Sequence, residues 1–285
     1  MRQPLTPLPV VVGIDGSKGA VQAALWAVDE AVSRDVPLRL VCAVDQRGLI
    51  DPEDAARKFA AADNFLRGAV TAVQATDRPV RVETEIVQGA PARTLADLSR
   101  SAALLCVGAV GLNHVQPGGF GSIAEVLATA ARCPVAIVGT HHSPAAHPGW
   151  IVVDVDESPD DGVVFDHAMR EARLRGRPLR VVSCRRPGPD GHRGLQSTAD
   201  GSRQVLAQQG RRLQKWNRRY PDVGVEFAAP CAGIVDYLAE SRQDAQLVVV
   251  SARNHHDVKQ LLGGSGSAAL LHTECSILVV GHQRG

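Results

Sequence analysis

The sequence predicts an α/β protein made of two tandem domains, each with a five-stranded parallel sheet flanked by helices. Three observations predict this class. Short apolar segments alternate with longer segments of helical composition along the 285 residues. The apolar segments have the length and continuity of strands that are buried on both faces. The order of segments then occurs a second time, which indicates parallel strands and helical crossovers in two copies.

The repeat has a nearly fixed offset, since a shift of 141 positions aligns Asp15 with Asp156. A repeat of this length indicates a duplicated domain rather than a short solenoid unit. Because 45% of the residues are apolar, each copy can bury a core of its own. We therefore expect one domain at 1–142 and another at 143–285, with the proline-containing segment 140–149 as the linker.

Local signals predict each element of the first copy. The run VVVGID predicts the first strand, and Ser17 follows it as a preferred cap for a helix. A second helix is expected to begin near Asp51. The acidic residues there either interact favourably with the positive end of the helix dipole or approach a divalent ion. The expected strands lie near 9–14, 38–44, 80–87, 103–108 and 134–139. The expected helices lie near 18–34, 53–75, 91–101 and 122–131.

The second copy is expected to follow the same order. Its apolar runs predict strands near 150–155, 179–184, 223–228, 246–251 and 276–281. Ligands of parallel sheets bind outside the carboxyl ends of the strands, where the strand order reverses. Asp15, Ala43 and Gly108 lie at such ends in the first copy, so we expect them to converge on one crevice.

A glycine-rich segment, GAVGLNHVQPGGFGS (108–122), has the spacing Gly-x2-Gly-x9-Gly-Ser between a predicted strand and a predicted helix. Such a turn exposes backbone N–H groups beside the positive end of a helix dipole, which suits phosphate. Gly108 and Gly111 are expected to take positive φ and to let the backbone approach a ligand. Gly121 opens the next helix, and Ser122 adds a hydroxyl donor. The alternative is a loop that merely turns the chain.

This spacing resembles the nucleotide-binding signature of the universal stress protein family, in its ATP-binding branch. The segments VVVGIDGS, LVCAVD and CPVAIVG match further features of the family, in the family's order. The resemblance covers nearly the whole chain as a tandem member. It implies a Rossmann-like, adenine-nucleotide-hydrolase-like fold for both copies and a role in the stress response. It also implies ATP, with or without magnesium, as the ligand of the first copy.

The resemblance also implies roles for individual residues. Asp15 is expected to reach the adenosine part of the nucleotide, and the backbone of Ala43 is expected to hold the adenine. The complete set of implied ATP-binding residues is Gly13, Ile14, Asp15, Ala43, Val107, Gly108, Gly111, Gly121, Ser122 and Ile123.

The second copy departs from this signature, because Gly108 and Gly111 correspond to Ser251 and Asn254. A side chain at 251 would intrude where backbone should approach phosphate. The later segment LLGGSGS (261–267) keeps glycine and serine, but its register is ambiguous. We therefore expect a degenerate motif in the second copy and one tight ATP site per chain.

The sequence favours a regulatory binder over a fast enzyme. It lacks the Gly-x4-Gly-Lys-Ser/Thr loop whose lysine stabilises a transferring phosphate, and no side chain can be assigned as a catalytic base. The family resemblance implies nucleotide binding with at most slow hydrolysis. One alternative is a slow ATPase or adenine-nucleotide hydrolase. Another is an interaction module that has lost its ligand, against which the intact first motif argues.

Composition excludes several classes. The net charge of +1 gives no electrostatic case for nucleic acid or a membrane surface. The basic segment 211–219 is expected to be a solvated helix face, and the six cysteines show no metal-binding spacing. No stretch has the apolar length of a transmembrane helix, and the N-terminus has no signal-peptide core. The cytoplasm is the expected location.

The last strand of each copy bears on assembly. Segments 134–139 and 276–281 are both apolar, and an uncovered edge of this kind is a liability. Single-domain members of the family that the chain resembles pair through their last strands. We therefore expect the two copies to pack as a pseudo-twofold pair through these segments. A homodimer of the whole chain and an unidentified protein partner are further expectations.

Overall fold

The structure is a computed structural model, and it describes part of the chain. The described residues are 7–47, 51–111, 121–139, 149–155, 161–183, 216, 218–228, 231, 233–240, 245–263, 266, 270 and 275–281. Asp156, most of the expected linker 140–149 and most of the basic segment 211–219 lie outside them.

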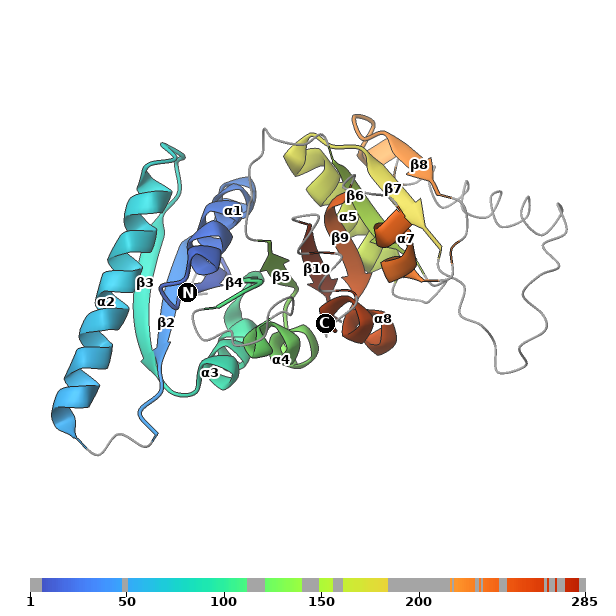
Figure 1. The fold of residues 1–285 in the computed structure, drawn as a ribbon. Coiled ribbons are helices and arrows are strands. Elements are labelled where there is room, and N and C mark those ends of the chain that lie inside the picture. Colours follow the sequence, from blue (N-terminus) through green and yellow to red (C-terminus); the bar gives the residue numbers. More distant parts are fainter. Residues whose placement is uncertain are drawn as a thin grey trace, which may run out of the picture.

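The strands form one ten-stranded sheet in the order β3-β2-β1-β4-β5-β10-β9-β6-β7-β8 (Figure 1). The first half contributes β1 (Val10–Gly13), β2 (Leu38–Val44), β3 (Val82–Gln88), β4 (Leu104–Gly108) and β5 (Val135–Val138). The second half contributes β6 (Trp150–Asp154), β7 (Leu179–Val182), β8 (Val225–Phe227), β9 (Ala245–Ser251) and β10 (Ser276–Val280). All neighbouring strands within each half are parallel, which confirms the predicted fold class.

Helices cover both faces of the sheet. One face packs against α1 (Lys18–Arg34), α2 (Pro52–Gln74) and α5 (Asp161–Arg175). The other packs against α3 (Pro91–Leu98), α4 (Ser122–Ala130), α7 (Ile234–Glu240) and α8 (His255–Leu262). Successive strand residues alternate between the two core clusters, as the pleat of a strand requires. No helix among the described residues is long and apolar enough to cross a lipid bilayer.

Side chains cap the first two helices where the sequence predicts. The Ser17 hydroxyl accepts a hydrogen bond from the Ala20 N–H at 3.1 Å and begins α1. Asp51 caps α2 by accepting from the Glu53 N–H at 2.9 Å, so the helix-start interpretation of this acidic segment is confirmed. The expected helix 91–101 ends earlier, at Leu98, and a short 3₁₀ turn, Ser99–Ser101, completes it.

The two halves meet at the centre of the sheet through their last strands. β5 and β10 pair in antiparallel fashion, with Ile137 opposite Ile277. The Gly139 N–H also donates to the Ser276 hydroxyl at 3.2 Å. This pairing covers both edges, and it confirms the expectation that the copies join through these strands. Helices α1 and α5 also touch across this junction.

Candidate functional site

A cavity of about 640 Å³ opens at the carboxyl edge of the first half of the sheet. Its size is typical of sites for small molecules and cofactors. The ends of β1, β2 and β4 form its floor, and α2, α3 and the first turn of α4 contribute to its walls. All ten residues that the sequence predicts for the site line this one cavity.

The cavity lies where the strand order reverses. β1 pairs with β2 on one side and with β4 on the other. The chain therefore leaves β1 in one direction and β4 in the other, and the diverging loops leave a crevice between them. Asp15 follows β1, Ala43 lies near the end of β2 and Gly108 ends β4, so the predicted convergence of these three residues is observed.

Asp15 is held at the start of α1. Its Oδ1 accepts a hydrogen bond from the Ser17 N–H at 2.9 Å. Its Oδ2 lies close to Gly111, since a Cβ built on Gly111 would stand 2.8 Å from that oxygen. Glycine at 111 therefore leaves room for the carboxylate of Asp15. The glycine-rich segment and the aspartate that follows β1 lie against each other.

Gly108 has a packing role that the sequence did not reveal. A Cβ at this position would stand 2.5 Å from the carbonyl carbon of Gly19, which lies in the first turn of α1. A Cβ on Gly19 would in turn stand 2.6 Å from the carbonyl oxygen of Val110. Two glycines thus allow the end of β4 and the start of α1 to touch backbone to backbone.

The expectation of positive φ at Gly108 and Gly111 is wrong. Among the described residues near the cavity, positive φ occurs at Gly16, with φ of +85°, in the turn that follows Asp15. The chain reverses direction between β1 and α1 at that point. The motif glycines serve close approach, whereas Gly16 serves the sharp turn.

Sequence reasoning missed the wall that α2 contributes. Lys58 and Phe65 from this helix line the cavity together with Asp45, just beyond β2. The ring of Phe65 lies against Gly16, where an added Cβ would come within 2.5 Å of it. The Lys58 ammonium donates to the carbonyl oxygen of Asp45 at 3.2 Å. Hydrogen bonds from Arg47 lower the pKa of Asp45 to about 2, so its carboxylate is ionised at neutral pH.

The first turn of α4 supplies backbone donors on the opposite side. Gly121 precedes the helix and provides no side-chain cap, and Ser122 and Ile123 line the cavity. Free N–H groups and the helix dipole favour an anion at such an end. Glu125 lines the same region and opposes an anion that arrives without a counter-ion. Within the described residues, no group of three or more metal-ligating side chains stands close enough to hold an ion alone.

The second half builds the corresponding turn differently. After β9 the chain enters α8 at His255, and most of the corresponding residues of the first half lie outside the described part of the chain. Asn254 caps α8 by accepting from the Asp257 N–H, and its φ of −79° is not left-handed. The buried Ser251 accepts a hydrogen bond from the Arg253 N–H at 3.2 Å. At the two positions that correspond to Gly108 and Gly111, the second half therefore carries side chains that accept hydrogen bonds from its own backbone.

Comparison with known proteins gives a consistent result. The model of the Universal stress protein family matches residues 8–139 and again residues 150–281. Universal stress protein Rv2028c of Mycobacterium tuberculosis is 49% identical over 99% of both chains. Universal stress protein Rv3134c of the same species is 43% identical over 90% of this chain and 93% of its own. The crystal structure of a universal stress protein from Archaeoglobus fulgidus shares the fold, with a TM-score of 0.69, 13% identity and 96% coverage of each chain.

Proposed function

The chain belongs to the universal stress protein family, and from that premise we propose that its first half binds ATP as a regulatory ligand. The observation that carries the proposal is the convergence of ten motif residues, separated by up to 110 positions in sequence, on one cavity of about 640 Å³. We assign this domain to 1–142 and a second domain with a degenerate motif to 143–285.

The chemistry of the cavity walls suggests how the nucleotide lies. The adenine belongs at the end of β2, where the backbone of Ala43 offers hydrogen bonds and Phe65 offers an apolar surface. The ribose hydroxyls belong at Asp15, an acceptor already oriented by the turn into α1. The phosphates belong between the end of β4 and the first turn of α4, where backbone N–H groups are available.

The same walls favour binding over rapid hydrolysis. Among the described residues of the lining, Lys58 is the one basic side chain, and its ammonium is bonded to the carbonyl of Asp45 beside β2. Phosphoryl transfer needs positive charge around the moving phosphate. Magnesium fits this site only as an ion that enters with the nucleotide, coordinated by phosphate oxygens and by a carboxylate such as Glu125. There it would neutralise phosphate charge.

Calorimetry with the full chain tests the proposal. Titration with ATP in the presence of magnesium should give one site per chain, and GTP should bind much more weakly if Ala43 reads the adenine. Mass analysis of nucleotide released from the purified native protein identifies the bound base and the number of phosphates. Absence of ATP binding by an apo, folded chain would refute the function. Two equivalent sites would refute only the degenerate motif of the second half.

A further inference from the structure

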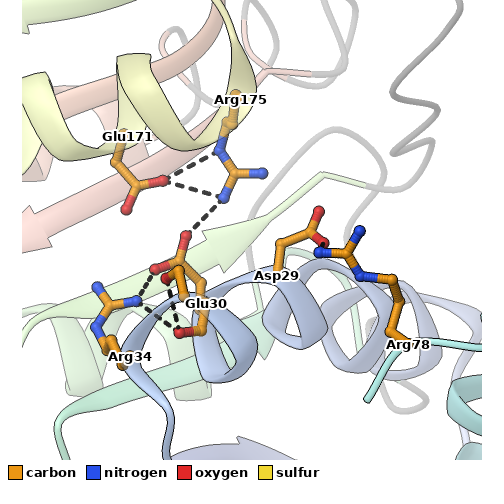
Figure 2. A network of polar contacts seen from close by, with 7 residues as sticks. Asp29, Glu30, Arg34, Arg78, Glu171 and Arg175 are labelled. Atoms are coloured by element: carbon orange, nitrogen blue, oxygen red, sulfur yellow. Dashed lines mark hydrogen bonds and ion pairs between the residues drawn. The ribbon is translucent and has the colours of Figure 1, made fainter. Parts of the chain in front are cut away.

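The internal repeat places the same charged pair on two helices that meet at the junction of the halves. Glu30 and Arg34 on α1 correspond to Glu171 and Arg175 on α5 at the offset of 141. Figure 2 shows that the four side chains converge between the two helices. The pseudo-twofold arrangement therefore brings two carboxyl groups and two guanidinium groups together.

The four groups form a buried network rather than a surface ion pair. Arg175 reaches across the junction, with Nη2 2.9 Å from Glu30 Oε1, and its Nε donates to Glu171 Oε2 at 3.0 Å. Arg34 also pairs with Glu30. The side chains of Glu30, Glu171 and Arg175 are 0%, 1% and 5% exposed. The ring of Trp26 lies 4.1 Å from the guanidinium of Arg175 and excludes water from it.

The two carboxyl groups are not equivalent, because Glu30 contacts both arginines and Glu171 contacts Arg175. Burial and the adjacent Glu30 raise the pKa of Glu171 to about 8. Burial by itself would also raise the pKa of Glu30, but Arg34 and Arg175 outweigh that effect and lower it. A hydrogen bond from Glu171 further favours the ionised form of Glu30.

Two further titratable groups near the pair, His167 and Cys106, hold no charge at neutral pH. Burial and the nearby Arg170 lower the pKa of His167, on α5, to about 4, so its ring is neutral. Burial and Glu30 raise the pKa of the Cys106 thiol, on β4, well above its usual range. Neither group can supply or remove charge when the carboxyl pair titrates between pH 6 and 9.

We propose that Glu30 and Glu171 form a proton-sensitive contact between the two domains, in which Glu171 carries a proton at neutral pH and hydrogen-bonds to ionised Glu30. Loss of this proton to solvent in mildly alkaline solution leaves two buried carboxylates beside one shared guanidinium. Their repulsion weakens the attachment of α1 to α5 while the β5–β10 pairing persists. The protonation state of Glu171 therefore sets the strength of the contact between α1 and α5.

The direction of the pH effect follows from linkage. The folded-state pKa of Glu171 lies above its usual value of 4.5, so its contribution to stability is complete below that pH. This stabilising contribution decreases as the pH rises from 4.5 to about 8, and above that range the stability does not change further through Glu171. Glu30, whose pKa is lowered, acts in the opposite sense and loses its contribution only in acid. The junction is therefore firmest in weakly acidic solution.

Urea unfolding of the full chain at several pH values tests this proposal. Glu171→Gln keeps the size and the hydrogen-bond donor of the protonated acid but cannot titrate. Relative to this variant, the unfolding equilibrium constant of the wild type should rise nearly tenfold between pH 6 and 7 and about fivefold between pH 7 and 8. The matched control is Glu226→Gln, because Glu226 is 62% exposed and pairs with Arg180 on the surface. Identical pH dependence in wild type and Glu171→Gln would overturn the proposal.

Infrared spectroscopy of the folded wild type gives a second readout that needs no variant to fold. In the wild type, the C=O stretch of a protonated carboxyl should be present at pH 6.5 and should disappear as the pH rises to 9. Glu226→Gln should show the same band at pH 6.5 and the same pH dependence. The band should be missing from a folded Glu171→Gln sample. A wild-type chain without this band at pH 6.5 would contradict the protonated state and with it the proposal.

Discussion

At the scale of single residues, glycines shape the site as much as residues with side chains do, because they let backbone segments pack closely. The contact between Gly108 and Gly19 sets how closely α1 approaches β4, and Gly111 leaves room for the carboxylate of Asp15. A protein interior is packed closely enough that one added carbon in such places forces a backbone shift. The glycines therefore act first on the fold, and their effect on the proposed ATP site follows from it.

The first residue-scale prediction follows from Gly108. Gly108→Ala should destabilise the chain by about 1–3 kcal/mol, because the new Cβ meets backbone that cannot move independently of α1. Gly68→Ala is the control, since Gly68 is exposed on α2 with nothing within 4 Å of an added Cβ. That control should stabilise by about 0.5–1 kcal/mol. Urea unfolding checks both, and equal stability of Gly108→Ala and wild type would refute the close contact.

The second residue-scale prediction concerns recognition. Asp15→Ala should weaken ATP binding by about 1–3 kcal/mol, or roughly 5- to 150-fold, because a buried ribose hydroxyl loses its acceptor. Asp63→Ala, which removes an exposed carboxylate on α2 paired with Arg67, should bind ATP as the wild type does. Calorimetry at one magnesium concentration measures both. Wild-type affinity in Asp15→Ala would remove this residue from the proposed site.

At the scale of elements, the fold could be predicted wherever a local signal was strong. The expected helix 18–34 is observed as Lys18–Arg34, because Ser17 caps it and its alanines face the core. The cavity could be predicted from Asp15 and the glycine-rich segment, since both lie at strand ends. The wall from α2 could not be, because the contact of Phe65 with Gly16 depends on how a helix packs nearly fifty residues later.

The second copy was expected to repeat the alternation of strands and helices, but no bounds were predicted for its helices, and α8 is one of them. The start of α8 is marked by Asn254, which caps the helix, and by Asp257, in its first turn. A capping residue followed three positions later by an acid is a recognised helix-start signal, and it was present in the sequence.

The element-scale prediction tests this helix. Asn254→Ala should destabilise the second half by about 1 kcal/mol through loss of the cap on α8. It should leave ATP affinity and stoichiometry unchanged, because the proposed site lies in the other half. Urea unfolding and calorimetry on the same preparation separate the two effects. A loss of bound ATP would indicate that the second half also contributes a nucleotide site.

At the scale of the whole molecule, duplication solves the problem of the sheet edge. β5 and β10 each present an apolar edge that the other covers, and Glu30 and Glu171 meet on the adjacent helices. The same surfaces are self-complementary, since each half carries a carboxyl and a guanidinium at equivalent positions. One half alone therefore retains what it needs to pair with a copy of itself.

The molecule-scale prediction is that the isolated fragment 1–142 dimerises. Its β5 would pair with β5 of a second copy, and Arg34 of each copy would face Glu30 of the other, in the place that Arg175 takes in the full chain. Arg34→Glu should reduce dimerisation, because the new carboxylate would face Glu30 of the other copy in the new junction. Leu8→Lys, at a residue that is 50% exposed, is the control and should remain dimeric.

Light scattering gives the mass of each fragment, and circular dichroism confirms that it is folded. A stable fragment monomer that still binds ATP would show that the junction is not required for the site and that the exposed edge of β5 is tolerated.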